Sequence, residues 1–428
     1  MQIPFPYPDV PPVTVPDAQL MGIYATPTCT VRHDVAALTA AALAQPIGTA
    51  PLRDLARGAR TVLLVVDDIS RPTPVHLLLP AILAELHAAG VPDGGIEFMA
   101  ALGTHRFMTA AEFAAKLGPE VAAHYRCHNH DWQDPQACEF VGQTAQGVEV
   151  WINRKVAQAD LVIGVGRIMP IEVCGFTGGG KILVPGVCGK ITNDDMHWTR
   201  IDLNDAEIVG RRDNPVRASI DALARQAGLD FIVNVIMDMH QQVAHVVAGD
   251  LVEAHRHGCT LALEMHAVPI PHEADIVIAD SYPFDIEFWQ ANKALDQAGP
   301  VVRPGGTLIL VTPCREGFSA VHPEILQFGY PCKHTIKKLV ASGQIKSKVV
   351  GVHMAQVGHV ARDRAKVVLV TSGIPAEHVR QVGLHWAPTP QAALDEALAA
   401  HGPHARIAVL RGAAEMLPLV GPPSATSP

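Results

Sequence analysis

Short apolar runs, each followed by a polar turn and then by a helical pattern, recur along this chain of 428 residues. The clearest are RTVLLVV at 60–66 and ADLVIGVG at 159–166. Continuous apolar runs of this length, rich in valine, are typical of strands that a parallel sheet buries on both faces. Strands that alternate with helices connect by right-handed crossovers. The pattern therefore predicts an α/β fold with mostly parallel sheets flanked by helices.

The alternation breaks near residues 268–273, where the sequence VPIP precedes a fresh strand pattern. We therefore predict an N-terminal α/β domain over 1–270, a C-terminal α/β domain over 271–420 and a disordered tail over 421–428. The first thirty residues are rich in proline, and we expect them to form an extended arm. In the second domain the predicted strands cover 275–279, 306–312, 348–352, 366–371 and 406–410.

Composition and charge exclude several classes of protein. Apolar residues make up 48% of the chain and the formal net charge is −9, with no basic stretch longer than 333–338, which argues against nucleic-acid binding. No apolar run is long enough to span a bilayer, and the N-terminus lacks the pattern of a secretory signal. The eight cysteines include no C-x-x-C pair and are typical of reduced thiols. We expect a cytoplasmic protein without nucleic-acid or membrane partners.

A glycine-rich segment, GFTGGGK at 175–181, follows the strand pattern at 159–166. Consecutive glycines allow a backbone with positive φ and let a ligand approach main-chain N–H groups, which bind phosphate well. The segment is not a P-loop, because Ile182 follows Lys181 where a hydroxyl would be needed for Mg²⁺. The alternative is a tight turn with no ligand.

Polar residues also follow two of the predicted strands. DDISRPTP at 67–74 comes after the strand at 60–66, and GTHR at 103–106 comes after the strand at 95–101. Open α/β sheets place ligand-binding groups at the carboxyl ends of their strands. The alternative is that Asp67, Asp68 and Ser70 cap the helix that begins near Thr73.

Histidines and a spaced Gln–Lys pair offer further candidates. His105 is placed to act as a general base, with a hydrogen-bonded structural imidazole as the alternative. The segment HNHD at 128–131 suggests a metal site, but no third ligand lies at a known zinc spacing, so we favour a turn held by imidazole hydrogen bonds. Gln290 and Lys293 share a helix face that either meets a small anion or is simply solvated.

The motifs together resemble the nickel-pincer lactate racemase family. The resemblance runs from about Arg60 to Glu316. It is carried by the segments 67–74, 103–106 and 175–181, by Pro185-Gly186, by His197, by Gln290 with Lys293, and by Gly305-Gly306. The resemblance implies a two-domain α/β fold with the active site in the cleft between the domains.

The resemblance also implies a cofactor. Lys181 would be joined through a thioamide to a nicotinate-derived nucleotide that holds nickel through two sulfurs and a ring carbon, the nickel-pincer nucleotide. His197 would supply the remaining nickel ligand, a role that suits neutral imidazole. Thr177, Gly178 and Gly179 would line this cofactor.

Further side chains would surround the cofactor and the substrate. They are Asp68, Ser70, Arg71, His105, Trp289, Gln290 and Lys293. Among them His105 would take the proton from the 2-hydroxyl of a 2-hydroxy acid, and Gln290 with Lys293 would bind its carboxylate. The implied reaction inverts C2 by removing and returning a hydride, so the predicted activity is that of a 2-hydroxy acid racemase or epimerase, an isomerase.

One position departs from the family pattern. The family has a Pro-His pair ahead of the glycine loop, and its histidine serves as the second base. This chain has Pro170-Ile171-Glu172. Ile171 carries no proton, so Glu172 is a tentative replacement, with a surface carboxylate as the alternative. The departure suggests that the substrate is a different or larger 2-hydroxy acid than lactate.

Two other functions stay open at the level of sequence. A nicotinamide-dependent 2-hydroxy acid dehydrogenase is suggested by the strand at 275–279 and Gly305-Gly306, but the Gly-x-Gly-x-x-Gly fingerprint is missing. A cofactor carrier, or a homologue that lost its activity with the second base, is the other. Expected partners are the small acid and, transiently, proteins that build the cofactor. The oligomeric state is open, with a homo-oligomer as one alternative.

Overall fold

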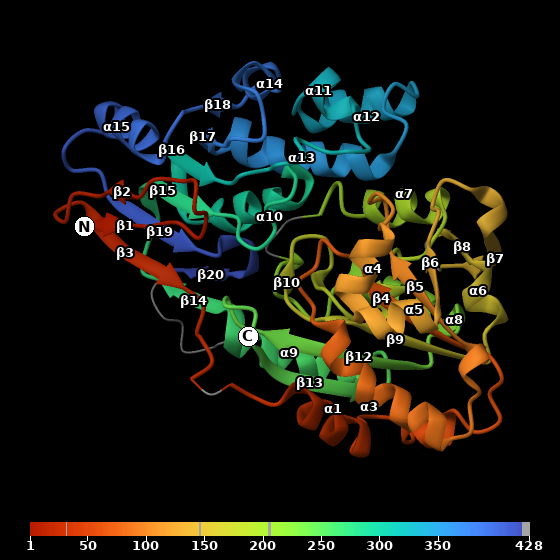
Figure 1. Cartoon of the computed structure of the whole chain (residues 1–428). Helices are drawn as coiled ribbons and strands as arrows, with labels where there is room; N and C mark the ends of the chain where they lie inside the picture. Colours follow the sequence, from red (N-terminus) through yellow and green to blue (C-terminus); the bar gives the residue numbers. More distant parts are fainter. Residues whose placement is uncertain (31, 145–146, 204–206, 422–428) are drawn as a thin grey trace. The chain divides into compact units, whose positions relative to one another are not determined.

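The computed structural model describes residues 1–428 except 31, 145–146, 204–206 and 422–428. The chain divides into two compact units. Unit 1 contains residues 1–27 and 266–428, and unit 2 contains residues 28–265. Both units are built from a mainly parallel sheet with helices (Figure 1), so the predicted α/β class is confirmed. The predicted tail lies outside the described residues except for Gly421.

Unit 2 is organised around a six-stranded sheet in the order β13-β12-β9-β4-β5-β6. In sequence order its strands are β4 (Val62–Asp67), β5 (Ile96–Ala101), β6 (Arg126–Asn129), β9 (Leu161–Arg167), β12 (Phe231–Met237) and β13 (Val243–Gly249). All neighbouring pairs are parallel except β12 and β13, which run antiparallel. The carboxyl ends of β4, β5 and β9 therefore lie along one edge of the sheet.

Helices and loops cover both faces of this sheet. The helices are α1 (Val35–Ala44), α2 (Leu52–Leu55), α3 (Val75–Ala88), α4 (Ala110–Leu117), α5 (Pro119–His124), α6 (Arg154–Gln158), α7 (Lys190–Trp198), α8 (Pro215–Gln226) and α9 (Glu253–His266). Successive β4 residues enter opposite cores, with Leu64 packed toward α3 and Leu63 packed toward α8. This explains why residues 62–66 of this strand are all apolar. No helix in the described ranges is long and apolar enough to cross a membrane.

Short hairpins and turns carry the segments next to the strand ends. Unit 2 adds the paired strands β7 (Cys138–Gln143) and β8 (Glu149–Asn153), the paired strands β10 (Pro170–Ile171) and β11 (Gly175–Phe176), and the 3₁₀ turn η3 (Gly179–Ile182). The β10–β11 hairpin places the glycine-rich segment directly after the end of β9.

Unit 1 contains a second six-stranded sheet, in the order β18-β17-β16-β15-β19-β3, with every neighbouring pair parallel. Its strands are β3 (Leu20–Ala25), β15 (Ala274–Asp280), β16 (Val302–Val311), β17 (Ala365–Val370), β18 (His385–Trp386) and β19 (Ile407–Arg411). Its helices are α10 (Phe288–Ala298), α11 (Glu324–Phe328), α12 (Lys333–Ala341), α13 (Lys348–Asp363), α14 (Ala376–Gln381) and α15 (Pro390–His401). A short parallel pair joins β14 (Ala267–Ile270) to β20 (Leu417–Val420).

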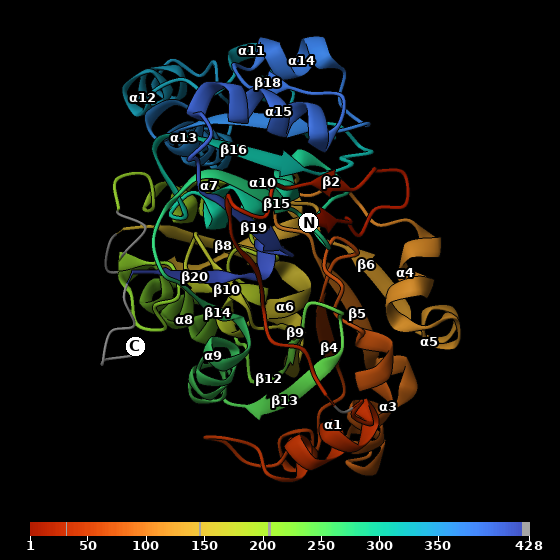
Figure 2. The same cartoon turned by 90° about the vertical axis from the view of Figure 1, so that its left-hand side faces the viewer.

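The proline-rich N-terminus is part of unit 1 rather than an extended arm. β1 (Gln2–Ile3) pairs with β2 (Val13–Thr14), and β3 adds an edge strand beside β19 (Figures 1 and 2, red). Ile3 and Val13 are buried in the core of this unit. The prediction failed because sequence patterns do not show that a short, proline-interrupted segment can pair with a strand almost 400 residues later.

The strand predicted at 348–352 is wrong, because this segment begins the long helix α13. The run VVGV is compatible with either structure when it is considered alone. Buried residues continue at Met354, Val357 and Val360, a spacing that matches a helix face and extends well beyond the length of a typical strand.

The N-terminal segment offers a direct test of this packing. Ile3 is 2% exposed and Ile23 is 43% exposed. We expect Ile3→Ala to cost about 2–5 kcal/mol of unfolding free energy, because it leaves a cavity in the core of unit 1. The matched control Ile23→Ala should change it by only about 0.5 kcal/mol or less. Urea denaturation followed by fluorescence measures both; equal effects would contradict the assignment of this segment to the core.

Candidate active site

A polar turn follows β4 and is held by a buried lysine. Lys116 of α4 is 3% exposed, and its Nζ lies 2.5 Å from Oδ1 of Asp67. The same Nζ donates to the main-chain oxygens of Asp68 at 3.0 Å and Arg71 at 2.8 Å. The ammonium thus fixes the turn and compensates a buried carboxylate. Sequence analysis missed Lys116, because its charge gave no sign that it would be buried.

Asp68, His105 and Ser70 form one hydrogen-bonded group at this sheet edge. Oδ2 of Asp68 accepts from Nδ1 of His105, and the Ser70 hydroxyl donates to Oδ1 of Asp68. Nη1 of Arg71 donates to the Ser70 hydroxyl at 3.2 Å. The structure therefore brings these four predicted residues together. The alternative that this turn caps α3 is wrong, since the N-cap of α3 is Pro74 and no side chain caps it.

Electrostatics keep Asp68 ionised beside His105. Burial alone would raise the pKa of Asp68, but the charge and hydrogen bond of His105, aided by Arg71 and Ser70, hold that pKa well below its usual range. An ionised Asp68 accepts the Nδ1 hydrogen of His105. The basic nitrogen of a neutral His105 is then Nε2. An imidazole oriented in this way by a carboxylate is a standard arrangement for a general base.

The glycine-rich loop, residues 175–181, packs tightly against its own unit. Gly178 and Gly179 have φ of 76° and 58°, which favour glycine. A Cβ at Gly178 would lie 2.7 Å from Ile168, and one at Gly179 would lie 2.7 Å from His255. These glycines are therefore required by the close approach of the loop to neighbouring side chains, whatever ligand the other side of the loop meets.

Lys181 lies at the end of this loop and is only partly exposed. Burial lowers the pKa of its amine below the ordinary value; Cys174 opposes this shift, Arg71 and Arg217 add to it, and Glu172 opposes it. A lowered pKa increases the fraction of neutral amine, which is the form that attacks an acyl carbon. The environment of Lys181 thus suits covalent attachment of a ligand.

His197 lies on α7 and has a fixed ring orientation. Its Nδ1 lies 2.8 Å from the main-chain oxygen of Asn193, to which it donates. Burial lowers the pKa of His197 to about 4, the hydrogen bond to Asn193 opposes this shift, and the charge of Lys181 adds to it. The imidazole is therefore neutral at physiological pH, with Nε2 as its basic nitrogen. This is the protonation state of a histidine that ligates a metal.

These groups lie within electrostatic range of one another in unit 2. The pKa of His197 responds to Lys181 and also to His105, while the pKa of Lys181 responds to Arg71 and Glu172. Segments that follow β4, β5 and β9 thus converge with α7. Thr177 lies in the same loop, where its hydroxyl donates to the main-chain oxygen of the last residue of β9 at 2.7 Å.

Glu172 is a buried carboxylate of this region. It is 7% exposed, so the surface alternative is wrong. Its Oε2 has no hydrogen-bond partner among the described residues, and Nε of Arg200 holds its main-chain oxygen at 2.9 Å. Ile171 is 3% exposed and packs in the apolar core next to the sheet. Ile171 is therefore a core residue, and its neighbour Glu172 carries the ionisable group.

Gln290, Lys293 and Trp289 lie on α10 in unit 1. Nζ of Lys293 donates to Oε1 of Gln290 at 2.5 Å, and the two side chains are 6% and 2% exposed. The alternative of a solvated helix face is wrong. Trp289 packs between the rings of His322 and His353, with centroids at 4.2 Å and 4.4 Å.

The two histidines of HNHD hydrogen-bond within unit 2. Nε2 of His128 lies 2.9 Å from Glu97, and His130 is bonded to the main-chain oxygen of Cys188 at 2.8 Å. His128 lies in β6 rather than in a turn. Across the described ranges, no group of three or more His, Cys, Asp or Glu side chains is arranged to hold a metal.

The residues present fit a cofactor that brings most of its own metal ligands. Lys181 offers an amine with a lowered pKa, and His197 offers a neutral imidazole whose Nδ1 is already occupied. One protein imidazole and one attachment point are what the family resemblance implies for the nickel-pincer nucleotide.

The state of the Lys181 amine can be measured in the apoprotein. We expect its acylation by acetic anhydride to reach half of the maximal rate at a lower pH than that of Lys333, which is exposed, because burial disfavours the ammonium form. Peptide mass mapping across a pH series gives both midpoints. Coincident midpoints would contradict the environment described for Lys181.

Comparison with known proteins supports this reading of the motifs. Residues 10–208 match the lactate racemase N-terminal domain, and residues 270–416 match the lactate racemase C-terminal domain. Lactate racemase of Thermoanaerobacterium thermosaccharolyticum is 29% identical over 71% of this chain and 72% of its own length. Lactate racemase of Lactiplantibacillus plantarum is 32% identical over 64% of this chain and 65% of its own length, just under two thirds.

Solved structures agree with these matches. The apoprotein structure of the T. thermosaccharolyticum lactate racemase superposes with a TM-score of 0.85 at 25% identity, over 98% of this chain and 100% of that one. A crystal structure of a Thermotoga maritima protein has a TM-score of 0.70 at 21% identity, over 91% of this chain and 100% of that one, which shows the fold alone. The two family matches cover most of the chain, and this protein belongs to the lactate racemase family.

Proposed function

We propose that this protein inverts C2 of a 2-hydroxy acid with a nickel-pincer nucleotide attached to Lys181. The observation that carries the proposal is the convergence in unit 2 of an amine with a lowered pKa, a neutral imidazole at His197 and the Asp68–His105 pair. The relatives named lactate racemase support the class of reaction. The substrate itself is a separate question, because Ile171 and Glu172 depart from the family pattern.

The chemistry requires a hydride acceptor, because C2–H of a 2-hydroxy acid is too weakly acidic for ordinary proton abstraction. When bound, the cofactor supplies an electron-poor ring that takes up a hydride and gives it back. Lys181 would anchor this group and His197 would ligate its nickel, while Thr177, Gly178 and Gly179 would line it.

The protein's own task is to move the hydroxyl proton and to hold the acid. His105 would accept the proton at Nε2, and the ionised Asp68 would stabilise the imidazolium that forms. Arg71, tied to Ser70, would hold an oxygen of the substrate or cofactor by a charge-assisted hydrogen bond. Asp68, Ser70 and Arg71 are fixed before substrate arrives, because Lys116 holds the turn that carries them.

Gln290 and Lys293 would bind the substrate carboxylate, with Trp289 beside them. In this contact the buried ammonium of Lys293 is paired with a neutral amide oxygen. A substrate carboxylate would supply a negative charge, and ion pairing is stronger in a buried environment than in water. This assignment comes from the family resemblance and is tested by substitution of Lys293.

Glu172 would act as the second acid–base group. It is the ionisable side chain next to Ile171, it is buried, and its charge acts on the Lys181 amine. A carboxylate in place of an imidazole changes the shape and charge of the site. The substrate we propose is therefore a 2-hydroxy acid different from, or larger than, lactate.

A specific observation also favours a second candidate, a cofactor carrier or inactive homologue. Ile171 is buried in the apolar core, and a core isoleucine performs no proton transfer. Intact mass of protein produced with and without cofactor-building proteins, which we propose as transient partners, distinguishes the candidates. An adduct on Lys181 with turnover supports the racemase, and an adduct without turnover supports the carrier.

The hydride mechanism makes an isotopic prediction. We expect cofactor-loaded protein, incubated in H₂O with a panel of chiral 2-hydroxy acids that carry deuterium at C2, to give an inverted product that keeps the deuterium. Hydride return preserves this label, whereas proton abstraction exchanges it with solvent. Chiral chromatography with mass spectrometry measures both. Label lost to solvent would rule out hydride return, and no inversion with a loaded Lys181 would leave the carrier.

The base assignment predicts a separation of kinetic parameters. We expect His105→Gln to lower kcat by about 10²–10⁴-fold, because general acid–base catalysis contributes this much, with a smaller effect on KM. Exposed His76→Gln is the matched control and should behave as wild type. The measurement is the steady-state rate of inversion over a range of 2-hydroxy acid concentrations up to saturation. An unchanged kcat in His105→Gln would remove this residue from the mechanism.

Glu172 has its own test. We expect Glu172→Gln, which keeps the shape of the side chain, to lower kcat by about 100-fold or more while the Lys181 adduct still forms. Glu120→Gln, on the surface, serves as control. Adduct mass and inversion rate are measured on the same preparation. Full activity in Glu172→Gln would show that another group, or none, replaces the family's second histidine.

A further inference from the structure

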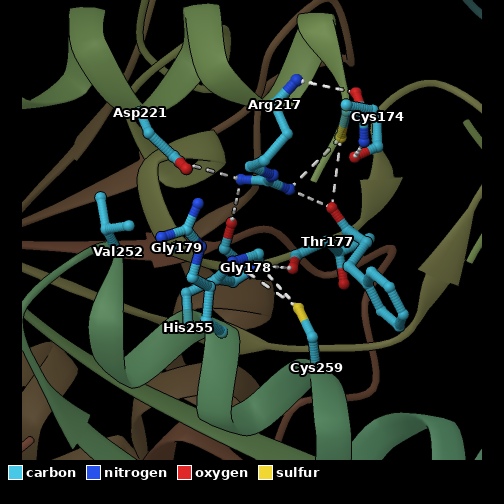
Figure 3. Close-up of polar contacts among 12 residues, drawn as sticks. Cys174, Thr177, Gly178, Gly179, Arg217, Asp221, Val252, His255 and Cys259 are labelled. Carbon is cyan, nitrogen blue, oxygen red and sulfur yellow. Dashed lines mark hydrogen bonds and ion pairs between the residues drawn. The ribbon is translucent and has the colours of Figure 1, made fainter. Parts of the chain in front are cut away.

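A buried arginine packs against the loop that carries Lys181 and binds its backbone. Arg217 of α8 is 3% exposed. One terminal nitrogen donates to the main-chain oxygen of Gly178 at 3.2 Å, and the other donates to that of Phe176. The second nitrogen also lies 3.4 Å from Sγ of Cys174. Asp221, one helical turn further along α8, pairs with the guanidinium at 3.4 Å. Figure 3 shows this group.

A buried histidine binds the carbonyl of Thr177, which lies between the two residues whose carbonyls Arg217 binds. Nε2 of His255 on α9 donates to the main-chain oxygen of Thr177 at 2.9 Å. His255 is 1% exposed, and Sγ of Cys259 lies 3.6 Å from its ring nitrogens. Figure 3 shows the loop between Arg217 of α8 and His255 of α9. The carbonyls of three consecutive residues, Phe176, Thr177 and Gly178, are therefore taken by buried side chains from two helices.

The hydrogen bonds of these carbonyls determine which way the loop backbone faces. A carbonyl oxygen carries partial negative charge, and a buried one needs a donor. Arg217 and His255 satisfy the three oxygens on the interior side, so these oxygens do not face a ligand that carries a phosphate. The amide of Gly179 is held as well, since it donates to Oδ1 of Asn234 at 2.9 Å. The backbone that precedes Lys181 is thus held by side chains from three elements, α8, α9 and β12.

We propose that Arg217 is a positioning residue for Lys181: with His255 it clamps the carbonyls of residues 176–178 so that the amine is held in place for cofactor attachment and catalysis. The inference rests on the proposed function for its catalytic consequence, but the clamp itself concerns the apoprotein. Arg217 donates to the loop carbonyls and pairs with Asp221, so its proposed effect on Lys181 is exerted through the loop. We expect a lysine to replace it only in part, because the shorter set of donors on one ammonium does not reproduce the planar guanidinium that here meets two carbonyls, the Cys174 sulfur and Asp221 at once.

The experiment measures amide hydrogen exchange of the full-length apoprotein by mass spectrometry. In Arg217→Met, we expect the amides of 177–183 to exchange about 10- to 100-fold faster, because two charge-assisted hydrogen bonds are lost, while those of β4 change little. Arg217→Lys should lie between wild type and Arg217→Met. Arg225→Met is the matched control on the same helix, where Arg225 is 57% exposed and pairs with Asp250.

Cofactor-loaded protein supplies the second readout. We expect Arg217→Met to lower kcat by about 100-fold with a smaller change in KM, since a misplaced reacting group costs about this much, and Arg217→Lys to restore part of it. His255→Leu should loosen the same amides, whereas His255→Gln, which keeps a donor, should loosen them less. This pair, together with Arg217→Lys, decides the question if Arg217→Met does not fold.

Two results would overturn the inference. One is loop exchange in Arg217→Met equal to that in Arg225→Met. The other is faster exchange throughout unit 2, which would show a general structural role. If wild-type protein inverts no acid but the loop still loosens selectively, the clamp stands and the proposed function fails. If wild type and Arg217→Met invert substrate equally well, the proposed function stands and the positioning role fails.

Discussion

The contact on which the candidate site most depends is the buried ion pair between Lys116 and Asp67. Removing a charge from water is costly unless a partner compensates it, and here the ammonium also binds two main-chain oxygens of the turn after β4. That turn carries Asp68 and Arg71. A pair of residues that touches no substrate in the proposal thus determines where the proposed base and its neighbours lie. The same carboxyl edge of the sheet receives His105 from the segment after β5.

In unit 2, a buried cation binds main-chain oxygens of a segment near the candidate site in two places. The turn after β4 and the glycine loop after β9 both follow the carboxyl end of a strand, and both are held by buried cations that bind main-chain oxygens. Lys116 serves the first segment and Arg217 serves the second. Backbone oxygens are suitable partners because they do not titrate.

Much of this could be predicted from residue patterns, and the failures have specific causes. β4, β5, β9 and β12 were predictable because strands buried on both faces are largely apolar. The helix α13 was mistaken for a strand because a four-residue apolar run fits both periods. Lys116, Arg217 and His255 escaped notice because a charged or polar residue on a helix is usually solvated, and only the folded structure shows what surrounds it.

The sequence by itself determined the α/β class, the family, and the set of candidate residues, because these follow from periodicity and from motifs that are local in the chain. The tertiary structure alone decided that Glu172 is buried, that Asp68 pairs with His105 instead of capping α3, and that residues 1–27 belong to unit 1, where β3 joins the second sheet. Each of these depends on contacts between segments that are distant in sequence. The free energy of such contacts comes from burial and electrostatic pairing, which no local pattern encodes.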